Sequence, residues 1–380
     1  MKWRIHLAEI EIGDDEKKAI AEVIDSKWLT MGGRTLEFER LFAKSHGAKY
    51  AVATSSCTAA LHLALKSSGI GSGDEVICPS MTFVASSNAV LYLGAKPVFA
   101  DIVSLENPVI SPLDIRRKIT SRTKAIIVMH YGGYPCEIEE IAGIAKKHSL
   151  FLIEDAAHAP LVKRSGKYLG TFGDVGCFSF YANKNITTAE GGMLITNNRR
   201  IAEQAQRNRS HGISHLAHER FTAGTVGYDV VDLGFNYRID EIRSAMGIVQ
   251  LKRVKKAKAN RKRAVEYYKN LLKDFSNLII PFYRYKGDSA YHLFGVVLGH
   301  SAGNRDKVIR YIHADRVQVS NHYAPVHLFN YYKKKLGTSK GMLPVTEEYG
   351  SRQVTLPLYN AISEKDIEEV VISLQKALKK

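Results

Sequence analysis

Apolar positions recur along the first half of the chain in short runs of strand length. Segments such as TAALHLALKSS and EIEEIAGIAKKHS, in which apolar residues return at helical spacing, separate several of these runs. The strand candidates are EVICPS, KPVFADI, KAIIVMHY, LFLIEDA, VGCFSFY and GGMLITN. Strands that alternate with helices predict an α/β protein with a largely parallel sheet, covered on both faces. Such sheets bind ligands at the carboxyl ends of their strands.

The second half of the chain has a different pattern. Its basic segment 251–275 predicts a long amphipathic helix. After it, YHLFGVVL and RVQVSNHYAP predict strands, and SEKDIEEVVISLQKALKK predicts a closing helix. A chain of 380 residues exceeds the usual size of one domain. We therefore expect an N-terminal arm (1–15), a large domain (16–250) and a small C-terminal α/β domain (251–380).

The composition narrows the class of protein. No apolar run approaches the roughly 18 to 20 residues that span a bilayer, and the N-terminus turns acidic where a signal peptide is apolar. We therefore expect a cytoplasmic protein with no membrane partner. Four cysteines lie far apart without a CxxC pair, which predicts buried thiols and neither a metal site nor disulfides. The net charge of +16 favours anionic partners, which include nucleic acid, acidic surfaces and small phosphorylated ligands.

Asp155 and Lys184 are the most informative single residues. Asp155 ends a predicted strand, where it either binds a ligand or caps a following helix, AAHA. Lys184 follows the next predicted strand, 29 residues later, so both side chains reach one sheet edge. An amine and a carboxylate so placed suit pyridoxal 5'-phosphate (PLP): the amine binds the cofactor covalently, and the carboxylate keeps its pyridine nitrogen protonated. The alternative for Lys184 is an ordinary surface lysine.

A phosphate group needs its own binding site. The stretch TSSCTAALHLAL starts a predicted helix at Cys57, Thr58 and Ala59, where free backbone N–H groups and the helix dipole favour an anion. Ser179, on the strand before Lys184, offers a further hydroxyl.

Eight stretches in chain order resemble motifs of the DegT/DnrJ/EryC1/StrS nucleotide-sugar aminotransferases, and together they cover nearly the whole chain. They are SKWLTMGGRTLEFER, CTAALHLAL, GSGDEVICPSMTFVASSNAVLYLGAKPVFADI, HYGGYP, IEDAAHA, GDVGCFSFYANKNITTAEGGMLITN, GFNYRIDEIRSAMG and HYAPVH. The resemblance implies the aspartate-aminotransferase fold (PLP fold type I): a large PLP-binding domain with a mostly parallel mixed sheet flanked by helices, and a smaller C-terminal α/β domain.

The same resemblance implies roles for individual residues at the cofactor. Lys184 would be the lysine that binds PLP and acts as general acid and base, and Asp155 would contact the pyridine nitrogen. Phe83 would stack on the ring, with core packing as its alternative. His158 would lie beside the phenolic oxygen, although a lone histidine is more often structural. The phosphate would contact Thr58, Ala59 and Ser179.

Other residues are implied at the substrate and at a second subunit. Asn236 would reach the phosphate from the other subunit, which requires a homodimer. His322 and Tyr323 resemble a segment near the sugar, with packing as the alternative. Arg238 either binds a substrate carboxylate or phosphate or forms a surface or interface salt bridge, and we favour the second.

The implied reaction moves an amino group from an amino acid, glutamate by resemblance, to a nucleotide-diphosphate-linked keto-sugar. The stretch NKNITTAEGG resembles members that act on 4-keto sugars, so we expect a 4-keto-6-deoxy substrate and a role in amino-sugar and polysaccharide biosynthesis. Members with histidine at the lysine position are dehydratases, and Lys184 therefore favours transamination. Many members have glycine where Ala189 stands, a change that removes backbone freedom but no functional group.

Two other classes of protein stay open. A nucleic-acid-binding protein would use KRVKKAKANRKR, in which eight of twelve residues are basic. The alternative is that these residues form the solvated face of a helix. The stretch lacks the interleaved aromatic residues, and the chain lacks the recognised fold, that are typical of nucleic-acid-binding proteins. A PLP-binding regulator without turnover would hold the cofactor but would not react with glutamate.

Overall fold

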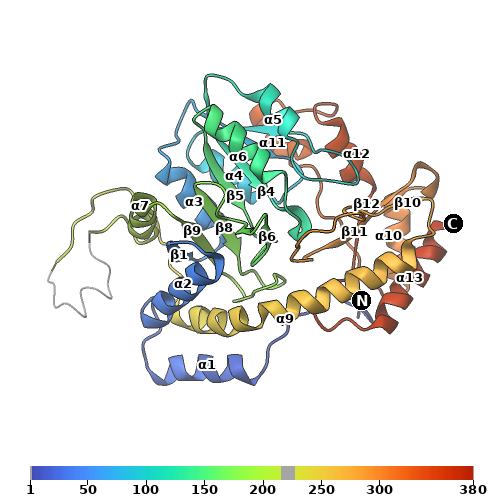
Figure 1. The fold of residues 1–380 in the computed structure, drawn as a ribbon, viewed down its shortest axis with the longest axis horizontal. Coiled ribbons are helices and arrows are strands. Elements are labelled where there is room, and N and C mark those ends of the chain that lie inside the picture. Colours follow the sequence, from blue (N-terminus) through green and yellow to red (C-terminus); the bar gives the residue numbers. More distant parts are fainter. Residues whose placement is uncertain (1, 215–226, 380) are drawn as a thin grey trace.

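The computed structural model describes residues 2–214 and 227–379, and seven strands of these residues form one central sheet (Figure 1). The strand order is β1-β9-β8-β5-β4-β2-β3. Strand β9 runs antiparallel to β1 and β8, and all other neighbouring strands are parallel, so the sheet is mixed and mostly parallel, which confirms the predicted α/β class. The strands are β1 (Tyr50–Thr54), β2 (Glu75–Pro79), β3 (Lys96–Ala100), β4 (Thr123–Met129), β5 (Phe151–Asp155), β8 (Val175–Ser179) and β9 (Gly192–Thr196).

Helices cover both faces of this sheet, as predicted. Adjacent strand residues point to opposite faces, so Ile77 and Cys78 of β2 belong to two separate hydrophobic clusters. Helices α2, α5 and α6 supply side chains to one cluster, and α3, α4 and α7 supply the other. Their bounds are α2 (Gly33–His46), α3 (Cys57–Ser67), α4 (Ala85–Tyr92), α5 (Pro112–Lys118), α6 (Ile138–Lys147) and α7 (Arg199–Arg209).

A long helix, α9 (Glu241–Leu272), runs beneath the sheet and on to the C-terminal elements (Figure 1). It packs against α1 (Asp14–Asp25), α2 and α13 (Glu364–Leu378). The helix begins ten residues before the predicted basic segment and crosses the expected boundary between residues 250 and 251. The division into an arm, a large domain and a small domain stays a prediction.

Part of the basic charge of α9 is used inside the fold. Arg253 forms ion pairs with the carboxylates of Asp15 and Glu16, and Lys258 pairs with Asp288. Arg261 is buried and donates hydrogen bonds to the Asn360 side chain and to backbone carbonyls. These contacts explain three of the eight basic residues that suggested nucleic-acid binding, and the other five lie exposed: Lys252, Lys255, Lys256, Lys262 and Arg263.

The C-terminal part contains a three-stranded antiparallel sheet in the order β10-β11-β12. The predicted strand YHLFGVVL and the closing helix are confirmed as β11 and α13. The remaining elements are β6 (Lys163–Arg164), β7 (Lys167–Tyr168), β10 (Leu278–Ile279), β11 (Phe294–Leu298), β12 (Gln353–Leu356), α10 (Arg305–Ala314), α11 (Asn330–Leu336), α12 (Pro344–Arg352), and the short helices η1 (Tyr131–Gly133), η2 (His300–Ala302) and η3 (Val326–Leu328).

The predicted strand RVQVSNHYAP is wrong. The segment forms only isolated bridges, which pair Val317 with Ile5 and Ser320 with Thr355. Beyond Ser320 the backbone leaves the sheet, because the His322 N–H donates to the side chain of Gln353 (3.0 Å) in place of a backbone carbonyl. The predicted helix AAHA also does not form: these residues make a turn, and Asp155 accepts a hydrogen bond from the Ala157 N–H within it.

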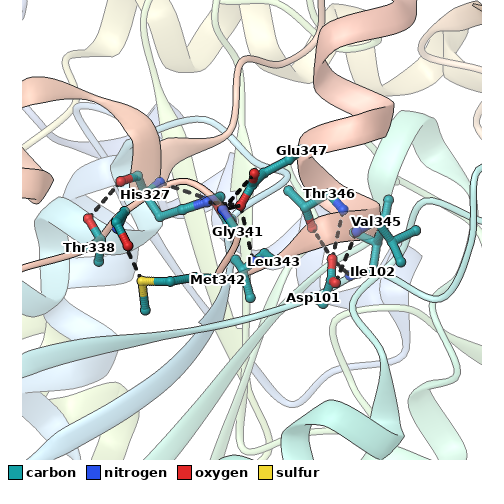
Figure 2. A network of polar contacts seen from close by, with 12 residues as sticks. Asp101, Ile102, His327, Thr338, Gly341, Met342, Leu343, Val345, Thr346 and Glu347 are labelled. Atoms are coloured by element: carbon teal, nitrogen blue, oxygen red, sulfur yellow. Dashed lines mark hydrogen bonds and ion pairs between the residues drawn. The ribbon is translucent and has the colours of Figure 1, made fainter.

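Two carboxylates fix the segment after residue 325 against the sheet (Figure 2). Asp101, which follows β3, accepts hydrogen bonds from the Thr346 N–H and hydroxyl (2.7 and 2.6 Å) at the start of α12. Glu347 accepts from the backbone of Gly341 (2.8 Å) and from His327 Nε2 (3.1 Å). His327 in turn contacts the Ser80 hydroxyl (2.7 Å) at the end of β2. The C-terminal part is thereby anchored beside the carboxyl ends of the large sheet.

Two further expectations from the sequence concern the cysteines and membrane-spanning helices. The four cysteines are free and buried, as predicted. Among residues 2–214 and 227–379, no helix has the length and apolar character needed to cross a membrane.

Candidate active site

A cavity of about 450 Å³ lies at the carboxyl ends of β1, β5 and β8. It brings together eight of the residues that the sequence singled out. They are Thr58, Phe83, Asp155, His158, Ser179, Lys184, His322 and Tyr323. Ala59, Asn236 and Arg238 do not line it.

Lys184 lies in a turn that follows β8. Its backbone N–H donates to the Tyr181 carbonyl (2.9 Å), and its half-buried side chain enters the cavity. Burial lowers the pKa of Lys184 from its ordinary 10.5 to about 8, while the nearby Asp155 carboxylate raises the pKa in part. With a pKa of about 8, roughly a tenth of this amine is neutral and nucleophilic at pH 7, far more than in an ordinary surface lysine.

Asp155 is the last residue of β5 and is 5% exposed. Its carboxylate accepts hydrogen bonds from the Ser86 hydroxyl (3.0 Å) and from the Ala157 N–H (3.1 Å). Burial nevertheless raises the pKa of Asp155, although these hydrogen bonds and the charge of Lys184 oppose that rise. A buried carboxylate in this state gains from a cationic partner such as a protonated pyridine nitrogen.

The start of α3 forms one end of the cavity. Ser56 caps the helix, because its hydroxyl accepts the Ala59 N–H (3.1 Å), which ties that amide to the cap. Gly192, at the start of β9, lies so close that an added Cβ would stand 2.5 Å from the Cys57 nitrogen. The glycine therefore lets β9 approach the helix start. Ser56, Cys57 and Thr58 all line the cavity, where the helix N-terminus favours an anion.

The side chains of His158 and Tyr323 contact each other at the cavity wall. The Gly132 N–H donates to His158 Nδ1 (3.3 Å), so the ring proton is on Nε2, which lies 3.1 Å from the Tyr323 hydroxyl oxygen. Burial lowers the pKa of His158 well below its ordinary value, and the charge of Lys184 adds to this. His158 is thus a neutral hydrogen-bond donor. Phe83 is 59% exposed and faces the same space, with its ring centre 6.2 Å from that of Tyr323.

His322 is held from two sides. Its Nδ1 lies 3.0 Å from the Thr355 hydroxyl, and its carbonyl accepts a hydrogen bond from the Tyr131 hydroxyl. Burial lowers the pKa of His322 to about 4. His322 thus places a neutral, fixed imidazole at the cavity wall next to Tyr323, and the expected position of both residues near the sugar stays a prediction.

Asn236 and Arg238 do not line this cavity. Asn236 is exposed and forms a backbone bridge with Ser210. Arg238 is half-buried, and burial and then the neighbouring Arg209 cation lower its pKa. An exposed position suits a residue that reaches another subunit, whereas both roles considered for Arg238 stay open.

Sequence reasoning missed several residues of this site. Tyr181, Asn183 and Glu190 line the cavity and stand in the same stretch as Lys184. Their position beside the lysine is a signal that could have found them. His292 lies 3.4 Å from the Lys184 amine but 108 residues away in sequence, with no motif around it.

The residues present fit PLP by their chemistry. Lys184 offers the amine, Asp155 the anionic partner, the start of α3 a phosphate site, and Phe83 an exposed aromatic face. When bound there, PLP would supply the electron sink that stabilises negative charge at a substrate carbon.

The fold and the cavity define an aminotransferase. The family model described as "DegT/DnrJ/EryC1/StrS aminotransferase family" matches residues 10–375, and the chain belongs to this family, whose aminotransferases use PLP. The chain is 36% identical to spore coat polysaccharide biosynthesis protein SpsC of Bacillus subtilis, over 97% of this chain and 95% of that protein. It is 34% identical to GDP-perosamine synthase of Escherichia coli O157:H7, over 95% of each chain.

A solved structure gives the same answer for the fold. PseC of Helicobacter pylori, described as an aminotransferase in pseudoaminic acid biosynthesis, superposes with a TM-score of 0.92. The two chains are 29% identical, and the match covers 100% of each. The structural match therefore confirms the predicted aspartate-aminotransferase-like fold, and the predicted family membership and enzyme class are confirmed as well.

Proposed function

We propose that this chain is a homodimeric PLP-dependent aminotransferase that moves an amino group from glutamate to a nucleotide-diphosphate-linked keto-sugar, in particular a 4-keto-6-deoxy sugar. The amino-sugar product would serve polysaccharide biosynthesis. The names of two relatives, a perosamine synthase and a spore coat polysaccharide protein, support this substrate class. The cytoplasmic location stays a prediction.

One observation carries the proposal: a lysine of lowered pKa and a buried carboxylate share one cavity. Lys184 is the group that removes the α-proton of the amino donor and later supplies a proton to the sugar carbon that receives nitrogen. The Asp155 carboxylate would stabilise a protonated pyridine nitrogen on the bound cofactor and so favour electron withdrawal from the reacting carbon. Phe83, His158 and the start of α3 orient the bound cofactor.

The test uses the purified protein with glutamate and a panel of nucleotide-linked 3-keto and 4-keto sugars. We expect mass spectrometry to detect an amino-sugar from the 4-keto-6-deoxy members, and none from the Lys184→Ala variant. If every sugar stays unchanged while glutamate is still converted to its keto acid, the sugar assignment is wrong. If the protein holds no PLP, the enzyme proposal itself is wrong.

The homodimer is proposed from an exposed apolar segment next to Asn236. Val230, Val231 and Leu233 are 60%, 52% and 74% exposed, which is unusual for three large apolar side chains so close in sequence. A second copy that covers them would bring Asn236 towards the cavity of its partner. Asn236 could then donate a hydrogen bond to the cofactor phosphate that we expect at the start of α3 in the partner.

Leu233→Asp tests the dimer. We expect the variant to elute as a monomer in size-exclusion chromatography with light scattering, and to retain PLP more weakly than the wild type. Ile372→Asp is the matched control, because Ile372 is 49% exposed on α13, at the other end of the molecule (Figure 1). A Leu233→Asp variant that stays dimeric contradicts the proposed interface.

A further inference from the structure

His292 is buried against the catalytic lysine and plays no part in the function proposed above. Its Nε2 lies 3.4 Å from the Lys184 amine nitrogen, and the residue is 5% exposed. It stands just before β11 and so comes from a different part of the chain than the other residues around the lysine. A polar group at this position influences the direction in which the amine points.

The hydrogen bonds around His292 assign its tautomer. The Asn185 amide nitrogen donates to the Ala290 carbonyl (2.7 Å), so the Asn185 oxygen is the atom that faces His292 Nδ1 (2.8 Å). An amide oxygen only accepts hydrogen bonds, and Nδ1 must therefore carry the ring proton. His292 Nε2 is left with a lone pair, and it can only accept a hydrogen bond from the Lys184 amine.

The surroundings keep His292 uncharged. Burial lowers the pKa of His292 well below its ordinary value, and the neighbouring groups act in the same direction. Those groups are His158, Lys184, Arg261 and His322. The imidazole ring packs against that of His158 with 4.1 Å between the ring centres. His292 is consequently a hydrogen-bond acceptor that does not take up the proton that Lys184 carries.

The backbone of His292 is fixed as well. Its N–H donates to the Gly132 carbonyl (2.9 Å), which connects it to the loop after β4. The buried guanidinium of Arg261 on α9 lies 3.4 Å from its carbonyl and 3.1 Å from that of Leu358. These contacts hold the imidazole in place when the lysine amine moves.

We propose that His292 is a positioning residue for Lys184. Held in one tautomer by Asn185, its neutral imidazole accepts a hydrogen bond from the lysine amine. This hydrogen bond directs one N–H of the Lys184 amine away from the reacting carbon. The lone pair of the amine nitrogen then points towards the cavity. The inference rests on the proposed function, because the role matters only if Lys184 transfers a proton.

Two variants remove this hydrogen bond and one preserves it. His292→Leu lacks the acceptor, and Asn185→Leu frees the imidazole to place its proton on Nε2, where it opposes the amine. His292→Gln keeps an acceptor oxygen within reach. His46→Leu is the matched control, because His46 is also a buried histidine of lowered pKa but lies away from the cavity.

The first measurement uses cofactor-free protein. The acylation rate of Lys184 is followed against pH by peptide mapping, which reports the pKa of the amine without any turnover. We expect His292→Leu and Asn185→Leu to lower the pKa midpoint of Lys184 labelling, because the ammonium form loses an acceptor. The midpoint should stay unchanged in His292→Gln and His46→Leu.

The second measurement is the rate at which PLP-loaded protein reacts with glutamate. We expect a loss of about tenfold to a hundredfold in His292→Leu and Asn185→Leu, the effect of one hydrogen bond to a charged group, with recovery in His292→Gln. Unchanged labelling and rates in His292→Leu overturn the inference. So does an equal loss in His292→Gln and His292→Leu, which indicates a packing role. Wild-type protein that binds no PLP contradicts the proposed function instead.

Discussion

Strand β5 carries two adjacent carboxylates on opposite faces, and their surroundings differ. Glu154 is fully buried and accepts three hydrogen bonds, from His130 Nε2 (3.0 Å) and from the N–H groups of Gly170 (2.7 Å) and Gly173 (2.8 Å). All of these donors belong to the chain itself. Asp155, the next residue, lines the cavity and accepts two hydrogen bonds from the chain. Glu154 is satisfied by the fold, whereas Asp155 still has room for a partner.

This difference separates structural from functional polar groups in the protein. A buried carboxylate that the chain fully satisfies stabilises the fold and is available for nothing else. Burial raises the pKa of Asp155, and it lowers the pKa of Lys184 to about 8 in the same cavity. Groups whose charged forms the fold disfavours are suited to a bound partner and to proton transfer.

The comparison is tested most strongly by Asp155→Asn. We expect the rate of the reaction with glutamate to fall about 10²- to 10³-fold, as on removal of other groups that stabilise transition-state charge. The folded state raises the pKa of Asp155 above its ordinary 3.8. The free energy of unfolding therefore falls as the pH rises from 3.8 through the raised folded value, and it stays lower above that value. Cofactor-free Asp155→Asn should therefore unfold at a higher temperature than the wild type at neutral pH. A variant with wild-type rates contradicts the role of Asp155.

Glu154→Gln should give the opposite pattern. Its amide nitrogen replaces an acceptor oxygen and faces an N–H donor, so we expect the free energy of unfolding to fall by about 2 kcal/mol. Chemical denaturation measures this change. The rate per folded, PLP-loaded molecule should be unchanged, because Glu154 does not line the cavity. A Glu154→Gln variant that loses rate but no stability contradicts the purely structural role given to Glu154.

The lowered pKa of Lys184 predicts how the rate of PLP binding depends on pH. Only the neutral amine of Lys184 captures PLP, so the capture rate of cofactor-free protein should rise nearly tenfold per pH unit below the pKa and level off above about pH 8. Stopped-flow absorbance follows this reaction. A midpoint near the ordinary lysine pKa of 10.5 shows that the cavity does not alter the amine.

The smallest expected effect concerns Ala189. Its φ of +67° lies in the left-handed region, which is unfavourable for alanine but not for glycine. We expect Ala189→Gly to stabilise the protein by about 0.5 kcal/mol, since the greater freedom of glycine in the unfolded chain offsets part of the gain. Ala202→Gly, inside helix α7, is the control and should destabilise by about 1 kcal/mol. A loss of stability in Ala189→Gly contradicts this interpretation.

Six of the seven strands of the central sheet could be predicted because their apolar runs are local in sequence, and residues such as Asp155 follow from being at strand ends. Strand β1 (Tyr50–Thr54) was missed. The wrong strand, RVQVSNHYAP, has the right residue types, but the Gln353 side chain takes the backbone N–H of His322. His292 could not be predicted, since its distance from Lys184 depends on how distant segments fold together. Local pattern thus predicts elements and their ends, whereas contacts between distant segments require the structure.

Borohydride reduction of the purified, PLP-loaded protein is the most direct test of the central claim. Reduction fixes the cofactor to the amine that holds it, and mass spectrometry of the digested protein then locates the modified residue. We expect the label on Lys184 in the wild type and no label in Lys184→Ala. A label on any other lysine, or unlabelled wild-type protein, contradicts the account of this site.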